Sequence, residues 1–499
     1  MPVHAARGSG WDSSAGRVLA RAVMGPLAGV VPPGLVDEVL AGCGAVQRRF
    51  RVLPSRLGVY FVLGLCLFRG LGYPAVLRQL VHGLEGRLGA AGWALPSATA
   101  LSRLRGRLGE APFAALLGAL AGALVPPGGA GLRVCGLVAV GWDGTQVEVA
   151  ASEANIAALG RQRGTHYPRL RVVALVACGT RAVLAAAVGA AGERELAAGL
   201  TGALRAGMLL LADRGFYSAQ LWAAAAGTGA DLLWRVSRNL ELPVLRVLPD
   251  GSWLSAVPDP AEVHRAANRR YYRRTTTRPR TVARPRATRA APVRVIAFTL
   301  TVTTAGGGTR DEHYRLVTTL LDPAAAPARE LAAAYALRWA VETALAELKT
   351  YLRGGPGTVL RSGDPAGARQ EMWAFLVIYQ AIRIVICAAA AGAGLDPGRI
   401  SFTAALHAIR RHASHRDPAA ARAAVEADIL DPRSLVRHRP GRACPRITRR
   451  AAPGPAAAGN ASPAQARQDC TITITTPAPA PRTDHRQPQQ PREHPEASP

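Results

Sequence analysis

The sequence predicts an α/β protein in which a mixed β-sheet flanked by helices follows an N-terminal helical domain. Three observations along the 499-residue chain support this prediction. Helical patterns punctuated by Pro and Gly fill residues 1–130, buried strands alternate with helices beyond residue 131, and β-type segments occupy about 238–322. We therefore expect a helical domain over 1–130 and a sheet-containing domain over 131–440, interrupted by a β insertion at about 238–322.

The charge of the chain favours a polyanionic partner. Lys and Arg number 61 against 33 Asp and Glu, which gives a formal net charge of +28 and an isoelectric point near 11.3. Nucleic acid is the simplest partner for such an excess. The alternative is a genomic bias toward Arg, Ala and Gly codons, because that bias would raise the charge without selecting a partner.

Cysteine usage and the first residues indicate a cytoplasmic protein. The seven cysteines show no metal-ligand spacing, and their odd number argues against a disulfide framework. The opening residues, MPVHAARGSG, lack the apolar region of a signal peptide. The most apolar run, Leu57–Phe68, is too short to span a bilayer and is typical of a buried helix.

The N-terminal domain is predicted from five helical segments that show no clear helix-turn-helix spacing. DNA binding by this domain is suggested only by its basic surroundings. Beyond about residue 440 the composition is rich in Pro, Ala, Thr, Gln and Arg, which predicts a disordered basic tail over 441–499. The five segments are Val36–Cys43, Ser55–Phe68, Ala75–Leu84, Ala98–Leu108 and Ala114–Leu124.

Two predicted strands end in aspartate. Val134–Trp142 is an almost continuous apolar run followed by Asp143, and Met208–Ala212 is followed by Asp213. A hairpin of two further apolar strands is expected within residues 170–188. Because open α/β sheets form their sites beyond the carboxyl ends of strands, we expect the two aspartates to lie near one edge of the sheet.

The predicted insertion combines strands with an arginine-rich run. Asp250-Gly251 marks a hairpin, and further β-type segments occupy Val293–Thr303 and His313–Leu320. Between these parts, residues 269–289 interleave arginines with a Tyr-Tyr pair, a combination that suits phosphate contact and base stacking. A disordered, solvated loop is the alternative interpretation, and ordering on DNA would reconcile the two.

A helix predicted over about Pro327–Leu352 carries polar side chains on one face. Tyr335, Arg338, Glu342 and Lys349 project within an arc of about 60° when successive residues turn by roughly 100°. Lys349 is the only lysine in the chain. An amphipathic helix with a solvated polar face is the alternative. The opposite, apolar face is formed by Leu337, Val341, Ala344 and Leu348.

Three carboxylates in this arrangement point to metal-dependent phosphoryl transfer. Asp143 and Asp213 follow strands, and Glu342 lies on the later helix. Oxygen ligands without a Cys or His cluster suit Mg²⁺ or Mn²⁺, and two such ions about 3.5–4 Å apart clamp an in-line displacement at phosphorus. A glycosidase would also use paired carboxylates, but it would not explain the basic charge.

The chain resembles the bacterial DDE transposases of the insertion sequence four group, in the branch with a Tyr-Arg-Glu-Lys signature. The signature Y-x2-R-x3-E-x6-K is matched in full by the four polar residues of the predicted helix. WDGTQVEVAASEANIAALG is similar to the first acidic motif, with Asn155 and Gly160 in place and Leu159 where an aromatic residue is usual. The runs YPRLRVVALVACGT, LLLADRGFYS and LPSRLGVYFVLGLCLF are also similar to the family.

The resemblance implies an RNase H-like fold, interrupted by a β-strand insertion, that acts on double-stranded DNA as a homodimer on paired transposon ends. It implies cleavage at those ends and strand transfer into target DNA in the bacterial cytoplasm, at the nucleoid. A relic that binds DNA without cutting it, or an RNase H-like nuclease without strand transfer, remains the alternative.

The resemblance also assigns roles to residues of this sequence. The metal ligands would be Asp143, Asp213 and Glu342, holding two Mg²⁺ ions with Mn²⁺ as a substitute. The resemblance assigns DNA contacts to Tyr335, Arg338 and Lys349. By its position on the predicted helix, Trp339 is expected to stack on an unpaired or flipped base or to pack against the insertion. Arg235 and Arg238, just past the last predicted core strand, are weaker DNA-contact candidates.

Overall fold

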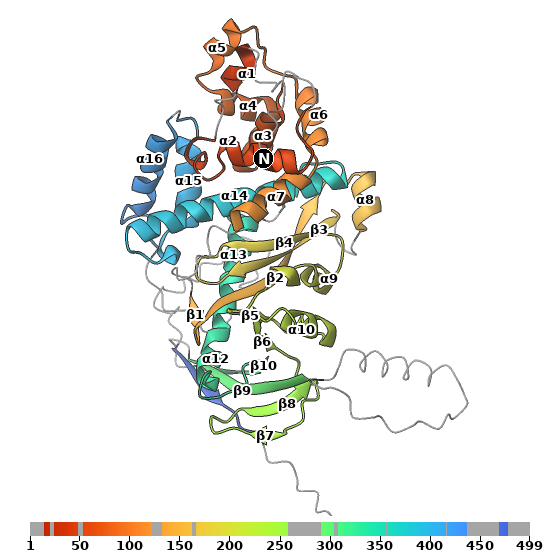
Figure 1. The fold of residues 1–499 in the computed structure, drawn as a ribbon, viewed down its shortest axis with the longest axis vertical. Coiled ribbons are helices and arrows are strands. Elements are labelled where there is room, and N and C mark those ends of the chain that lie inside the picture. The colour runs from red at the N-terminus through yellow and green to blue at the C-terminus, as the bar shows by residue number, and fades with distance from the viewer. Residues whose placement is uncertain are drawn as a thin grey trace, which may run out of the picture.

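The computed structural model describes residues 14–19, 24–47, 53–121, 132–161, 166–257, 291–303, 308–355, 357–415, 417–436 and 469–477. Its long axis runs from a helical end, which holds the N-terminal helices together with α15 and α16, to a β end that holds β7–β10 (Figure 1). A mixed sheet lies between the two ends.

The N-terminal helices form because apolar residues recur at helical spacing and Pro or Ser residues start several of the segments. Pro33 begins α2, Pro54 precedes α3, and the Ser97 hydroxyl accepts a hydrogen bond from the Ala100 N–H at the start of α6. The five predicted helices are confirmed. The bounds are α1 (Ser14–Leu19), η1 (Gly25–Leu27), α2 (Pro33–Gly42), α3 (Ser55–Leu67), α4 (Tyr73–Val81), α5 (Glu85–Ala90), α6 (Ala98–Leu108) and α7 (Ala111–Ala121).

The central sheet has the topology of an RNase H-like fold. Strands β2, β3 and β4 form an antiparallel meander, and β5 and β6 then pair in parallel on the other side of β2. Trp142, Trp222 and Trp234 are fully or almost fully buried on the face covered by α9 and α10. The bounds are β1 (Arg133–Val134), β2 (Leu137–Val149), α8 (Glu153–Leu159), β3 (Arg169–Ala177), β4 (Val183–Gly189), α9 (Glu193–Ala198), η3 (Thr201–Ala203), β5 (Met208–Ala212), α10 (Ala219–Ala226) and β6 (Asp231–Arg235).

The predicted strand Val134–Trp142 is wrong at both ends. A turn at Cys135-Gly136 separates β1 from β2, and β2 continues through Asp143 to Val149 instead of turning at residues 143–145. Strand β3 supplies the reason: it pairs with β2 from Val140 to Glu148, so the backbone of Asp143 stays in the ladder. Asp213, by contrast, directly follows β5 as predicted.

The inserted strands continue the central sheet. Strand β10 pairs antiparallel with β6, and the sheet then proceeds through β9 and β8 to β7. The hairpin around Asp250-Gly251 and the two later β segments are confirmed, whereas the arginine-rich run 269–289 lies outside the described residues. The bounds are β7 (Arg246–Val247), β8 (Trp253–Val257), β9 (Ala291–Thr303) and β10 (Thr309–Thr318).

A buried ion pair fastens the insertion to the start of the site helix. The side chain of Arg294 on β9 is fully buried and pairs with Asp250 of the hairpin. Arg294 also donates to the Ala326 carbonyl oxygen at 2.6 Å, and Asp250 accepts from the Ala328 N–H at 2.9 Å. Since Ala328 is the first residue of α12, this network fixes where the helix begins.

The predicted helix over residues 327–352 is helical but not one regular α-helix. A 3₁₀ turn interrupts it, and a π-helical turn ends it. Val341, Ala344 and Leu348 are buried as predicted, whereas Leu337 is half-buried and faces a pocket. The pieces are α12 (Ala328–Ala334), η4 (Tyr335–Arg338), α13 (Trp339–Ala346) and the π turn η5 (Glu347–Leu352).

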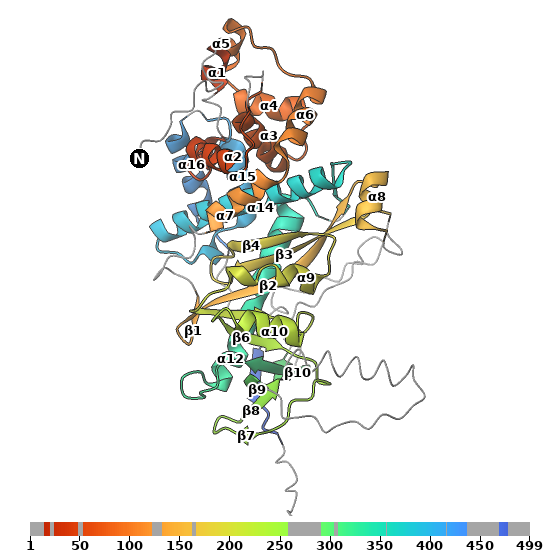
Figure 2. The same cartoon turned by 45° about the vertical axis from the view of Figure 1, so that its right-hand side comes forward.

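Helix α14 joins the two halves of the molecule. It lies between the N-terminal helices and the β3–β4 side of the sheet in Figure 1 and Figure 2. By length and composition it could cross a membrane, but 83% of its most apolar window is buried inside the protein, as in a core helix. The bounds are β11 (Val359–Leu360), α14 (Pro365–Gly392), η6 (Pro397–Arg399), α15 (Phe402–His412) and α16 (Pro418–Leu430).

The prediction of a wholly disordered tail is wrong for one segment. Asp469–Ile474 forms strand β12, which pairs antiparallel with β9 over Phe298–Thr303. The segment CTITI alternates Thr with Ile, and both are β-branched, a composition that favours a strand once an edge is available.

Candidate active site

The sheet brings the two predicted aspartates together. Strands β2 and β5 run parallel, with Gly141 paired to Leu211. Asp143 and Asp213 each lie two residues beyond this pair, so they follow neighbouring positions of the two strands. Adjacent strands are about 4.8 Å apart, so the two carboxylates start from neighbouring backbone positions.

Helix α13 approaches this part of β2 closely because β2 has a glycine there. A Cβ built on Gly141 would lie 2.8 Å from Cγ2 of Val341. The absence of a side chain lets the helix settle against the strand two residues before Asp143. The close approach carries Glu342, the next residue after Val341, to the same site.

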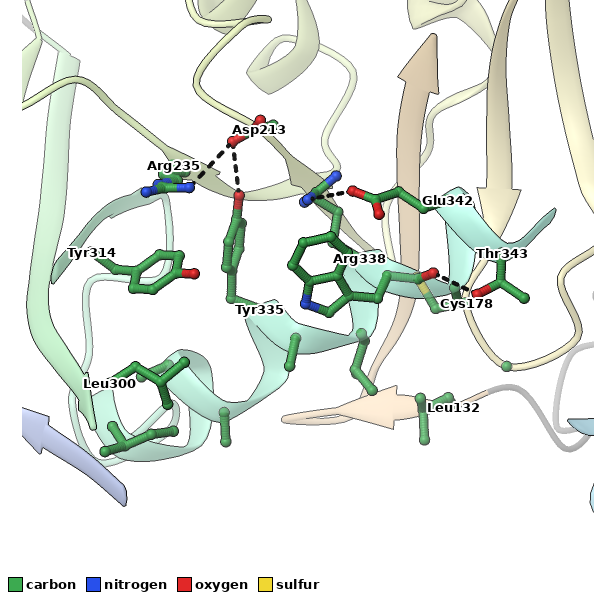
Figure 3. A pocket seen from close by; sticks show the side chains of 18 of the residues that line it. Leu132, Cys178, Asp213, Arg235, Leu300, Tyr314, Tyr335, Arg338, Glu342 and Thr343 are labelled. Atoms are coloured by element: carbon green, nitrogen blue, oxygen red, sulfur yellow. Dashed lines mark hydrogen bonds and ion pairs between the residues drawn. The ribbon is translucent and has the colours of Figure 1, made fainter. Parts of the chain in front are cut away.

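A cavity of about 900 Å³ opens beside these residues, and we call it the carboxylate pocket. Asp213 and Glu342 line it, and Figure 3 shows them on either side of Arg338. Asp143 is not a lining residue, but its side chain is 23% exposed and pairs with the same arginine. The other polar and charged residues that line the carboxylate pocket include Arg235, Tyr314, Tyr335, Trp339 and Thr343.

Arg338 holds two of the three carboxylates. Its guanidinium lies 3.6 Å from an Asp143 oxygen and donates a 3.0 Å hydrogen bond to Glu342. The side chain is 7% exposed. Burial alone would lower the pKa of Arg338, but Tyr335 and the neighbouring carboxylates raise it overall, so the group stays charged.

Asp213 has its own partners. The Tyr335 hydroxyl lies 3.4 Å from an Asp213 oxygen and equally far from the Ala212 carbonyl, and Arg235 lies 3.9 Å away. Burial raises the pKa of Tyr335, so its phenol remains protonated and can donate. Arg235 in turn stacks on Tyr314, with 4.3 Å between the guanidinium carbon and the ring centroid.

Asp143 is the least compensated acid of the site. Burial raises its pKa from 3.8 to about 6, against the lowering effects of the Gly144 N–H and Arg338. Glu342 and Glu193 raise it further. Glu193 begins α9, and its carboxylate occupies the space beside Gly144 that a Cβ would need. The site therefore holds more negative charge than Arg338 neutralises.

The donor set suits a hard divalent cation. Carboxylate oxygens are the ligands that Mg²⁺ and Mn²⁺ prefer, and no Cys or His competes for the ion in the described lining apart from Cys178. Within the described ranges, no three acidic, His or Cys side chains already converge on one point, because Arg338 stands between Asp143 and Glu342. The side chains of Asp213 and Glu342 are 39% and 38% exposed, which leaves them room to rotate.

Of the remaining predicted residues, one lines the carboxylate pocket and two do not. Trp339 lines the pocket, with its ring 4.8 Å from the Arg338 guanidinium carbon. Arg238 is exposed beyond β6 and is not a lining residue. Lys349 lies on the π turn, where burial and then Arg353 and Arg169 lower its pKa while Glu148 raises it. The predicted common face therefore holds for Tyr335, Arg338 and Glu342, but Lys349 does not line the pocket.

Glu193 and Tyr314 were not predicted from the sequence. Both come from segments whose patterns indicate only a helix start and a strand. An acidic residue at the first position of a helix is ordinary helix-dipole chemistry, so its proximity to Asp143 has no separate signal.

Comparisons with known proteins match most of the chain. Residues 21–118 match the insertion element 4 transposase N-terminal family, and residues 140–379 match the transposase DDE domain family. The chain is 27% identical over 390 residues to transposase InsG for insertion sequence element IS4 of Escherichia coli (strain K12), covering 74% of this chain and 78% of that protein. A piggyBac transposase synaptic complex with hairpin DNA is similar at a TM-score of 0.40 and 10% identity, covering 83% and 84% of the two chains.

Proposed function

Because this chain belongs to the insertion sequence 4 family of DDE transposases, enzymes that cleave and join DNA with divalent metal ions, we propose that Asp143, Asp213 and Glu342 are its catalytic carboxylates. The observation that supports this assignment is that each aspartate lies two residues beyond the paired residues Gly141 and Leu211 of the parallel strands β2 and β5, with Glu342 bound to the same arginine as Asp143. We propose Mg²⁺, replaceable by Mn²⁺, as the metal, with two ions in the site.

The chemistry that bound divalent ions supply is polarisation of the phosphodiester and neutralisation of charge on the attacking and leaving oxygens. The protein holds the three carboxylates on a rigid sheet and a packed helix, so little reorganisation is needed at the reacting position. Asp143 must be ionised to serve as a ligand, and its raised pKa of about 6 still permits this at neutral pH.

Arg338 has two alternative partners in this proposal. Without DNA it neutralises Asp143 and Glu342, and with DNA its planar guanidinium can bind a phosphate through two parallel hydrogen bonds. Transfer of Arg338 to the phosphate would free both carboxylates for the cation. One residue would then couple DNA binding to assembly of the catalytic centre.

The aromatic and cationic residues around the pocket would position the DNA. Tyr335 can donate its hydroxyl to a phosphate, and Trp339 can stack on an unpaired base at the cleaved end. Arg235, Arg238 and Lys349 would contact backbone phosphates at increasing distance from the carboxylates.

We also propose that the enzyme acts as a homodimer on two paired transposon ends, in the cytoplasm at the nucleoid. The helical region before residue 131 would contribute DNA contacts outside the catalytic pocket. Light scattering on the protein with end duplexes should give two chains per pair of ends, and one chain per pair would reject this arrangement.

Single-turnover cleavage tests the proposal as a whole. The substrate is a duplex that carries the terminal inverted repeat bracketing the gene, incubated with Mg²⁺, Mn²⁺ or EDTA. We expect cleavage at the repeat end with either metal, none in EDTA, and joined products when target DNA is added. Metal-independent cleavage, or cleavage without any joined product, would contradict the proposed reaction.

A further inference from the structure

A second cavity lies where the N-terminal helices meet the segment after the site helix. Its volume is about 330 Å³. Arg69 reaches it from the turn between α3 and α4, Arg353 from the end of the π turn, and Arg361 from the residue after β11. We call this cavity the arginine pocket, and its remaining lining is Gly70, Leu71, Gly72, Thr358, Val359, Leu360, Glu371 and Phe375.

The arginine pocket carries an uncompensated positive charge. The lining contains three arginines and one carboxylate, that of the buried Glu371, which lies 3.9 Å from the Arg361 guanidinium. Outside the lining, the charge of Glu148 acts on Arg353, which leaves Arg69 as the arginine without a carboxylate partner among the described residues. The Glu371 carboxylate accepts from the Ser362 hydroxyl at 3.1 Å and from the Arg361 N–H at 3.2 Å, and it lies 4.0 Å from Arg105. The net charge of the lining therefore favours an anion.

Arg353 contributes a deeply buried donor group to the pocket. Arg353 is 2% exposed, and its Nε atom is buried without a hydrogen-bond acceptor in the part of the chain that the structure describes. Its Nη1 donates to the Thr358 carbonyl oxygen. A buried guanidinium N–H without an acceptor is costly, so an anionic oxygen in the pocket would stabilise it.

The backbone of the pocket is shaped around Arg69. Gly354 has a φ of +107°, and a Cβ there would lie 2.2 Å from the guanidinium carbon of Arg69. Because glycine has no side chain, the Arg69 guanidinium can lie over the loop at this point. Arg69 also donates to the Thr358 hydroxyl at 3.2 Å, while Arg361 donates to the Arg69 carbonyl oxygen at 2.9 Å.

The position of the pocket relative to the carboxylates suits duplex DNA. Strand β11 pairs with β2 so that Val359 lies beside Glu148, five residues beyond Asp143. At roughly 3.3 Å per residue, this places the pocket edge about 17 Å from Asp143 along the strand. Since a duplex rises about 3.4 Å per base pair, the separation corresponds to about five base pairs.

We propose that Arg69, Arg353 and Arg361 form a binding site for one backbone phosphate of the transposon end, about five base pairs from the cleaved bond. This inference rests on the proposed function, because it takes the duplex to extend from the carboxylate pocket along β2. The site would connect the two matched regions of the chain, since Arg69 belongs to the N-terminal region and the other two arginines belong to the DDE domain. DNA binding would then hold the helical region against the catalytic sheet.

The test replaces single phosphates of the end duplex by neutral methylphosphonates, one position at a time. Binding is measured by fluorescence anisotropy in EDTA, so no cleavage is needed. For the wild-type protein we expect one position, about four to six base pairs from the cleaved bond, at which affinity falls about tenfold, as for loss of a charge-assisted contact. Arg69→Gln and Arg361→Gln should bind the natural duplex about tenfold more weakly and lose sensitivity at that position.

Arg78→Gln provides the matched control. Arg78 is exposed on α4 and does not line the arginine pocket. Its replacement by Gln removes one positive charge, as the pocket variants do. It should keep the wild-type sensitivity at every position. Gly354→Ala, which changes no charge, should weaken binding and reduce sensitivity at the same phosphate by displacing Arg69, with thermal unfolding used to confirm that it folds.

The result that would overturn the proposal is equal sensitivity of wild type, Arg69→Gln and Arg361→Gln at every phosphate. This outcome differs from failure of the proposed function. A wild-type protein that binds with the expected phosphate pattern but cannot cleave in Mg²⁺ would reject the catalytic assignment and leave the phosphate site standing.

Discussion

The carboxylate pocket and the arginine pocket lie at different points along β2, and they differ in which sign of charge is exposed. In the carboxylate pocket the central cation, Arg338, is buried, whereas the acids Asp213 and Glu342 are more than one-third exposed. In the arginine pocket the acid, Glu371, is buried, whereas Arg69 at the mouth is exposed. The exposed groups are therefore carboxylates in the carboxylate pocket and an arginine in the arginine pocket.

This difference indicates which ligand each pocket can bind. The pKa of Asp143 stays raised to about 6 despite Arg338, so an added cation would relieve the site. The Nε of Arg353 has no hydrogen-bond acceptor among the described residues, so a bound anion would stabilise the arginine pocket. A DNA strand together with metal ions supplies both, and the variants below are designed to separate the two pockets.

The largest expected effect is loss of cleavage when a carboxylate is neutralised. Asp213→Asn and Glu342→Gln should each slow single-turnover cleavage at least about 1000-fold, since a metal clamp contributes several kcal/mol to the barrier. End binding in EDTA should stay within a few-fold of wild type. Glu195→Gln, an exposed neighbour of the site on α9, should cleave normally. Cleavage within tenfold of wild type by either site variant would remove that residue from the catalytic centre.

The next largest effect concerns the pH dependence of stability through Asp143. Its folded-state pKa of about 6 exceeds the model-peptide value of 3.8, so the folded state binds the proton more tightly than the unfolded state. The resulting stabilisation is complete below pH 3.8 and is lost as pH rises through about 6. In EDTA, the free energy of unfolding of Asp143→Asn relative to wild type should therefore rise across this interval, by on the order of 2–3 kcal/mol.

Denaturant unfolding of the two proteins at several pH values measures this difference. A constant difference from pH 3.5 to 7 would show that Asp143 is not held in the environment described above. Mg²⁺ should stabilise the wild type more at pH 7.5 than at pH 5, because below about pH 6 the ion must displace a proton from Asp143.

A smaller effect is expected from Gly141→Ala. The added methyl group would lie 2.8 Å from Val341, so α13 must move away from β2. Overpacking of this kind costs about 1–3 kcal/mol of stability, and the shift should also slow cleavage because Glu342 follows Val341. Gly118→Ala, at an open position inside α7, is the control: it should leave cleavage unchanged and raise stability by up to about 1 kcal/mol through helix propensity. Wild-type stability and cleavage in Gly141→Ala would mean that this close contact does not position Glu342.

The smallest effect is expected at Lys349, which lies away from the carboxylate pocket and has Arg353 as a charged neighbour. Lys349→Gln should leave the cleavage rate of bound DNA within a few-fold of wild type. The slope of log affinity against log salt for end binding should become shallower by about 0.9, as for loss of one phosphate contact. An unchanged slope, with Arg78→Gln as reference, would argue against a phosphate contact.

Much of the carboxylate pocket is predictable from the sequence because local pattern determines it. Asp213 follows a five-residue buried strand, and Tyr335, Arg338 and Glu342 recur at helical spacing. Such spacings survive a short 3₁₀ turn, because three or four residues per turn keep these side chains on one side. Lys349 lies further along, beyond the start of the π turn, where the regular helical phase no longer predicts its direction.

Other features depend on contacts between distant segments and left no local signal. Asp143 lies within a strand because β3 extends alongside it, and β12 forms because the long strand β9 offers it an edge. The arginine pocket unites residues 69, 353 and 361, and in a chain with 61 basic residues no single arginine stands out. These features required the tertiary structure.

The most direct test of the central claim is to count metal ions in the complex with uncleaved end DNA. Mn²⁺ binding can be measured by electron paramagnetic resonance at pH 7.5, with wild type, Asp213→Asn and Glu195→Gln compared on the same duplex. We expect two tightly bound ions per active site in wild type and in Glu195→Gln, and fewer in Asp213→Asn. An unchanged number of ions in Asp213→Asn would contradict that claim.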